Sequence, residues 1–300
     1  MRHSGPVRVP HDSPGAGRLM RAKTLLIAGV VALCGTLSVS VLATRADQPR
    51  SLGCERLRLV ALNAFTVTNP DYAVDSGASD DEQDCGPAPG IVKVQVRARM
   101  AMDDPPGWSY DIHQESSSAL SVPLVKPWRM TGILAEIDQQ DPVYDEYGDA
   151  VSYLHKAGGD SVLKSSAVQV VVFLKKPVPE SSATRIWRNP EVVFLSGARG
   201  GKPLAWEPSI WCRFRGFDTC ASKGSAEPLT TEFREWVSLL KPEDAPALTG
   251  FGLSLNELRD HAAKGLIHGF VARNLPGTLE KLVTDPQILA AYITDIRPPR

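Results

Sequence analysis

An uninterrupted apolar run, residues 24–43 (TLLIAGVVALCGTLSVSVLA), constrains this chain more than any other feature. The run carries no charge and no proline, and as a helix it would be about 30 Å long, which matches the hydrocarbon core of a bilayer. Only a helix can cross there as a single segment, because every backbone polar group must be paired inside the membrane. We therefore predict a single transmembrane helix between a head, residues 1–23, and a tail of 257 residues.

Charges and cysteines predict the orientation of this helix. The head carries five Arg or Lys residues against one acid, although the far flank is basic as well. The positive-inside rule then favours a cytoplasmic head. Four of the five cysteines lie in the tail, an even number that suits two disulfides in an oxidising compartment. We expect a single-pass protein of the cell membrane, N-terminus in the cytoplasm and C-terminus outside, with disulfides Cys54–Cys85 and Cys212–Cys220.

The apolar run has a second interpretation, a cleaved signal peptide. Residues 41–43 and 44–46 both resemble small-residue cleavage sites. However, the apolar region of a signal peptide is only about 7–15 residues long, so we prefer a signal anchor. Within the anchor, Ala28, Ala32 and Thr36 form a row of small residues that could pack against a partner helix.

Composition limits the class of protein. The chain is close to neutral, with 22% charged residues and a net charge of -1, which argues against a nucleic-acid partner. The head contains three Gly and three Pro among 23 residues and is predicted to be disordered. We expect residues 47–300 to form the extracytoplasmic domain, with a division near residue 160 as an alternative.

Hydrophobic periodicity in the tail predicts helices mixed with strands. The clearest strand is 91–100, where apolar and charged residues alternate, and the apolar run 167–174 is typical of a strand buried on both sides. The other expected strands are 108–113, 119–125, 131–137, 191–195, 204–214, 266–272 and 288–296. The expected helices are 54–66, 179–187, 230–242, 254–264 and 276–282, of which the fourth begins at a capping box, Ser254 to Glu257, and stops at Gly265. The tail is therefore predicted to be an α+β domain.

Known catalytic patterns are not evident in the sequence. His113, His155, His261 and His268 have no second ligand at metal-binding spacing, and no nucleophile elbow or P-loop is present. The acidic loop around residues 80–84 could hold Ca²⁺ but lacks EF-hand spacing, so a solvated loop is the preferred interpretation. We predict no enzymatic activity, no metal and no cofactor. The tyrosines near residues 144–153 lie in an acidic segment that we expect to be rich in turns.

Three segments of the tail resemble a known bacterial family. ALNAFTVTNPDYAV (61–74) is similar to the post-membrane segment of the sigma factor regulators, and 167–186 and 251–282 are similar to the order of elements in their C-terminal region. The resemblance implies a membrane-anchored regulator that signals from outside to a cytoplasmic sigma factor. The short head departs from that pattern, because 23 residues without a core cannot fold as a sigma-binding domain.

These observations favour a membrane-anchored extracytoplasmic sensor or regulatory protein that modulates a sigma factor through a membrane partner. The alternative is a non-catalytic scaffold subunit of a cell-envelope complex. A third hypothesis is a secreted hydrolase cleaved after Ala43 or Ala46. The partners expected for the first two are the lipid bilayer, through residues 24–43, and a membrane or envelope protein.

Overall fold

The computed structural model describes residues 52–74, 90–99, 107–115, 118–126, 129–138, 150–197, 203–208 and 229–298. These residues belong to one compact unit, Pro49–Arg300. The predicted transmembrane helix 24–43, with Ala28, Ala32 and Thr36, lies outside the described residues, as do Cys85, Cys212 and Cys220. Among the helices that are described, none is long and apolar enough to cross a membrane.

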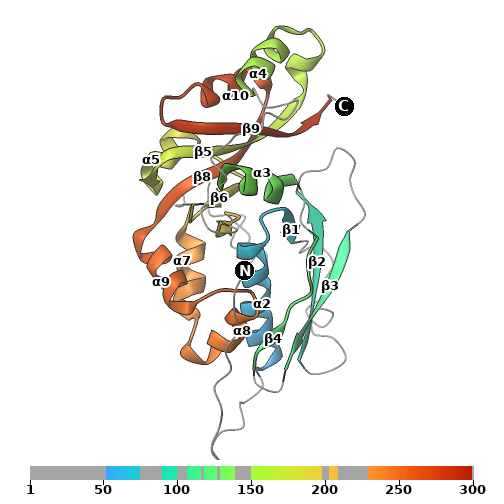
Figure 1. Cartoon of the computed structure of the whole chain (residues 1–300), viewed down its shortest axis with the longest axis vertical. Helices are drawn as coiled ribbons and strands as arrows, with labels where there is room; N and C mark the ends of the chain where they lie inside the picture. Colours follow the sequence, from blue (N-terminus) through green and yellow to red (C-terminus); the bar gives the residue numbers. More distant parts are fainter. Residues whose placement is uncertain are drawn as a thin grey trace, which may run out of the picture. The chain divides into compact units, whose positions relative to one another are not determined.

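The described residues form two antiparallel sheets and several helices (Figure 1). Sheet A contains β1 (Tyr72–Val74), β2 (Ile91–Ala98), β3 (Trp108–Gln114) and β4 (Leu120–Ser121). Sheet B contains β5 (Ala167–Pro179), β6 (Val192–Phe194), β7 (Ala205–Trp206), β8 (Leu266–Asn274) and β9 (Ile288–Arg297). The α-helices are α2 (Cys54–Thr68), α3 (Arg129–Asp138), α4 (Ala150–Gly159), α5 (Glu180–Ile186), α7 (Thr231–Leu239), α8 (Ala245–Thr249), α9 (Leu255–Lys264) and α10 (Pro276–Val283), and the short 3₁₀ helices are η1 (Leu163–Ser165) and η3 (Pro242–Asp244).

Helix α2 is largely buried in the large hydrophobic core cluster. Nine of its residues, among them Leu57, Val60 and Phe65, are buried. One side of α2 packs against sheet A, whose strand β2 alternates buried valines with exposed charged residues as the sequence predicts. Each fully buried Val, Leu or Phe contributes about 1.5–3 kcal/mol, so this helix is a principal source of stability.

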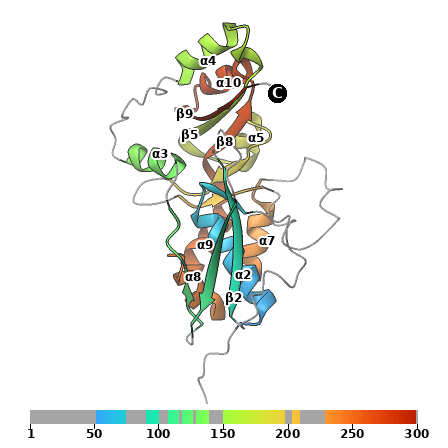
Figure 2. The same cartoon turned by 90° about the vertical axis from the view of Figure 1, so that its right-hand side faces the viewer.

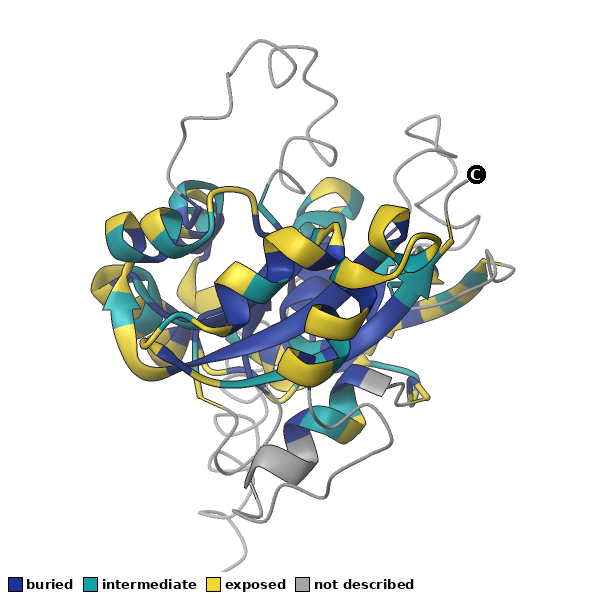
Figure 3. Ribbon diagram, turned by 90° about the horizontal axis from the view of Figure 1, so that it is seen from above, coloured by how far each residue is buried: buried dark blue, intermediate teal, exposed yellow. Residues whose placement is uncertain are grey.

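Sheet B has the strand order β7-β6-β8-β5-β9, and its two faces are covered by different helices. Helices α4 and α10 cover one face, and α3 lies on the other (Figures 1 and 2). The side chains of strand β5 point alternately to the two faces of the sheet. Val170 and Val172 belong to the large hydrophobic core cluster, whereas Val171 and Phe173 belong to a second, smaller cluster under α3. The strands are accordingly buried while the helices are exposed on their outer sides (Figure 3).

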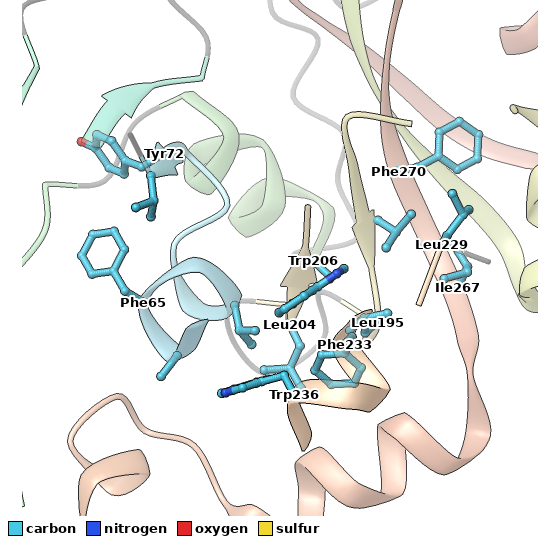
Figure 4. Packing of buried hydrophobic residues seen from close by; sticks show 14 of the residues in the cluster. Phe65, Tyr72, Leu195, Leu204, Trp206, Leu229, Phe233, Trp236, Ile267 and Phe270 are labelled. Atoms are coloured by element: carbon cyan, nitrogen blue, oxygen red, sulfur yellow. The ribbon is translucent and has the colours of Figure 1, made fainter. Parts of the chain in front are cut away.

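Aromatic side chains fill the core between α2, β7 and α7. Trp206 and Trp236 are fully buried and stack with ring centroids 6.0 Å apart, and Phe233 packs edge-on against Trp206 (Figure 4). Offset aromatic pairs add about 0.5–1.5 kcal/mol beyond their buried area. The two-residue strand β7 is therefore anchored by its side chains as well as by its pairing with β6.

Most predicted elements are confirmed, and the C-terminal order of helix, strand, helix, strand is present as α9, β8, α10 and β9. Gly265 stops α9 in the left-handed conformation, with φ 56°. The prediction of a capping box is wrong: Ser254 is the residue before α9, but the Ser254 side chain makes no cap hydrogen bond. Strand 119–125 is reduced to β4, and of the expected strand 204–214 the described part forms only β7.

The segment 131–137 was predicted as a strand, and this prediction is wrong: it lies in helix α3. Thr131 and Ile133 are β-branched and favour a strand locally. Met130 and Leu134, however, are both buried in the second cluster while Gly132 between them is exposed. In a strand these three positions would share one face, whereas in a helix Met130 and Leu134 lie one turn apart and Gly132 faces away. The expectation of turns is also wrong at residues 150–153, which form the start of helix α4, whereas residues 141–149 lie outside the described residues.

Candidate functional site

The face of sheet B under α3 carries an apolar patch. We define the patch by the sheet residues of the second cluster, which come from four neighbouring strands: Val171, Phe173, Val192, Phe194, Ala205 and Val271. The rings of Phe173 and Phe194 stack in parallel, with centroids 5.4 Å apart. Two side chains of α3, Met130 and Leu134, complete the cluster. The patch is thus built by sheet pairing and covered by a single short helix.

A polar row adjoins the apolar patch on the same face. Gln169 of β5 is paired in register with Arg273 of β8 and with Asp295 of β9, and paired residues of an antiparallel sheet point to the same side. The Gln169 amide donates to Glu191. Arg273 Nη2 donates to Glu191 Oε2 at 3.4 Å, and Arg273 Nε lies 2.8 Å from Glu191 Oε1 in the same ion pair. The row therefore places an amide between two charged groups.

Asp295 is the unusual member of the polar row. Its side chain is only 3% exposed. Arg297 Nε donates to Asp295 Oδ2 at 2.9 Å, whereas Oδ1 has no hydrogen-bond partner among the described residues. Leaving a buried acceptor unpaired costs about 1–3 kcal/mol, and more when the group is charged. The Oδ1 atom is thus a position where a donor or a cation would gain a hydrogen bond that the chain does not supply.

Helix α3 is fastened at its first turn by Asp71, a buried residue that follows α2. Asp71 Oδ1 accepts from the backbone N–H groups of Met130, at 2.8 Å, and Thr131, at 3.2 Å, and the Thr131 hydroxyl donates to Oδ2. The carboxylate satisfies amides that the helix leaves unpaired and lies at the positive end of the helix dipole. A residue distant in sequence therefore caps α3.

This side of sheet B combines the apolar patch, which α3 covers, with the polar row Gln169, Arg273 and Asp295 and the charged partners of that row, Glu191 and Arg297. Among the described residues no group of three or more His, Cys, Asp or Glu could hold a metal ion. Polar groups beside an apolar patch can fix the orientation of a docked partner.

The predicted site residues are placed as follows. Cys54, the first residue of α2, is disulfide-bonded. Its partner lies outside the described residues, so the pairing with Cys85 stays a prediction, as does the pairing of Cys212 with Cys220.

The histidines are scattered, with one exception. His261 at the end of α9 and His268 in β8 are close enough to interact electrostatically. Burial lowers the pKa of His268, and the neighbouring His261 lowers it further. His155 Nδ1 lies 2.7 Å from Glu280 Oε1 and joins α4 to α10 on the surface. Neither arrangement provides a third ligand or a nucleophile.

Sequence reasoning missed the polar row. A signal was present, since Gln169 and Asp295 are polar residues inside apolar strands, at 167–174 and 288–296. Buried polar residues are informative because they need partners. The order of the strands in the sheet, however, was needed to bring them together.

Comparison with protein-family models, curated proteins and solved structures gave no match for this chain.

Proposed function

We propose that this chain is a membrane-anchored extracytoplasmic regulatory protein whose tail docks a protein of the cell envelope. The bonded state of Cys54 carries the proposal, because structural disulfides persist in oxidising compartments and are rare in the cytosol. Cys54 follows the predicted span 24–43 by 11 residues, and α2 begins there. The tail would therefore fold outside the membrane, next to its anchor.

The second face of sheet B supports the docking part of the proposal. Its apolar patch and polar row lie on paired strands, which position side chains more precisely than loops do. The buried Asp295 Oδ1 accepts no hydrogen bond from the described residues. A partner that supplies apolar side chains for the patch and a cation for Asp295 would match both features.

The output of docking would pass through the membrane helix. Control of a sigma factor through a membrane partner is the output that the family resemblance implies. The scaffold alternative uses the same docking face without signalling, and the two differ in whether loss of docking changes transcription.

Site-specific photo-crosslinking in native membranes tests the proposal. A photoreactive amino acid replaces Gly132, which is exposed on α3, or Lys281, which is exposed on α10 across sheet B. We expect a crosslinked membrane or envelope protein from position 132 and not from position 281. Adducts of equal intensity from both positions, or from neither, would count against docking at this face.

Mass mapping tests the compartment independently. Peptides of the protein isolated from membranes with thiols blocked should contain Cys54–Cys85 and Cys212–Cys220. Free thiols at all four positions would remove the support for an extracytoplasmic tail, and an intact mass that lacks residues 1–43 or 1–46 would replace the anchor with a secreted protein.

A further inference from the structure

Helix α3 is short and carries a glycine on its exposed side. It has ten residues, and isolated helices shorter than about 12–15 residues are marginal in water. Gly132 is exposed in its interior, and glycine lowers helix stability. A Cβ atom at Gly132 would meet nothing within 4 Å, so crowding does not require glycine there. The sequence thus lowers the stability of α3 without a packing reason.

Contacts within sheet B hold the patch residues under α3 in place. Val171 of β5 and Val192 of β6 are each paired in register with Val271 of β8, so backbone hydrogen bonds of the sheet hold three patch residues together. Phe173 and Phe194 stack on each other. The described side chains of α3, Met130–Leu134, contribute two buried members of the cluster. Removal of the helix would therefore leave an ordered apolar surface.

We infer that α3 occupies the docking site in place of the partner, and that the partner presents an amphipathic helix. This helix carries two large apolar side chains four residues apart, as Met130 and Leu134 are, and a Lys or Arg that reaches Asp295 Oδ1. The inference deepens the proposed function and rests on it. Asp71 determines how firmly α3 stays on this docking site, because its carboxylate caps the first turn of α3.

Hydrogen exchange of the full-length protein in detergent micelles tests the exchange of α3. We expect the α3 amides to exchange by local opening, and Gly132→Ala to slow them about three- to fivefold because alanine favours the helix. Gly277→Ala is the matched control, since Gly277 is exposed in α10 and a Cβ there also meets nothing within 4 Å. It should leave α3 unchanged. Amides of α3 as protected as those of strand β5 would overturn the inference.

Binding in trans tests the occupant. The probe is a fluorescent peptide of residues 127–140 that carries Gly132→Ala, and the control peptide carries Met130→Ala and Leu134→Ala in addition. We expect saturable binding of the probe alone, about fivefold tighter to Asp71→Ala protein, because loss of the cap raises the open fraction. Should Asp71→Ala not fold, Thr131→Val, which removes the hydroxyl contact to Asp71, replaces it. Equal binding of both peptides, or no binding to either protein, contradicts the inference.

The envelope partner and the exchange of helices can fail separately. A partner crosslinked at position 132 while α3 stays closed would keep an envelope partner on this side of sheet B, and would remove both its contact with the covered patch and the exchange of helices. Peptide binding without any crosslinked membrane or envelope protein would keep the exchangeable site and remove the proposed envelope partner.

Discussion

Arg56 and Asp244, 188 residues apart in the chain, form an ion pair in which the carboxylate is completely buried. Arg56 Nε donates to Asp244 Oδ1 at 3.0 Å, and the guanidinium also donates to the Leu239 carbonyl at 2.8 Å. Asp244 accepts a further bond from the Lys241 backbone N–H. The first turn of α2 is thereby joined to the end of α7 and to η3, so the segment next to the predicted anchor is tied to the C-terminal helices.

Arg56→Ala should destabilise the tail by about 3 kcal/mol. Removing one partner of a buried ion pair leaves an uncompensated charge, which costs about 3–5 kcal/mol. The lower end of that range applies here because Arg56 is itself partly exposed. Urea unfolding followed by tryptophan fluorescence measures the change. Lys264→Ala, which breaks an exposed pair with Asp260, is the control and should cost less than 1 kcal/mol. Equal losses in both variants would mean that the Arg56 pair contributes little.

Glu180→Ala should destabilise α7, by about 1–3 kcal/mol. The buried Glu180 carboxylate accepts from the Thr230 backbone N–H at 3.1 Å and from the Thr230 hydroxyl at 2.7 Å, so it caps a helix to which it does not belong. In a double-mutant cycle with Thr230→Val, the two losses should be less than additive, since both variants remove the bond from the Thr230 hydroxyl to the Glu180 carboxylate. Additive losses would show that the two residues act independently.

Gly269→Ala should be destabilising by about 1–3 kcal/mol, because a Cβ there would lie 2.4 Å from the Val172 carbonyl oxygen and 3.1 Å from Phe194. The backbones of β8 and β5 cannot separate without breaking their pairing. Thermal unfolding of this variant is compared with that of Gly277→Ala, which has open space. A melting temperature at or above that of the unaltered protein would show that the strands can adjust.

Stability should fall in mild acid, in part through His268. Burial lowers the pKa of His268 in the folded state, with a further contribution from His261. Below the unfolded pKa of about 6.5 the unfolded chain binds the proton more readily, so the free energy of unfolding decreases as pH falls. Unfolding at pH 7.5 and 5.5 should differ less in His268→Gln. His113→Gln, an exposed change on β3, is the control, and a pH dependence unchanged by His268→Gln would contradict the assignment.

The sequence predicted those elements whose burial pattern is regular. The alternation in 91–98 gave β2, the apolar run 167–174 gave β5, and Gly265 marked the end of α9. Helix α3 was mispredicted because its local residues favour a strand. Its cap, Asp71, lies 59 residues away from Met130, and its buried face is defined only by the patch on sheet B.

For the site as well, local sequence patterns and the tertiary structure determined different features. By itself the sequence determined the mixed class of the tail, the apolar run 24–43 and the polar residues inside apolar strands, because periodicity and composition record burial locally. Only the tertiary structure decided that Gln169, Arg273 and Asp295 form one row and that α3 covers the patch beside it. These residues meet because of the strand order, and contacts between residues more than 100 positions apart leave no periodic signal in the chain.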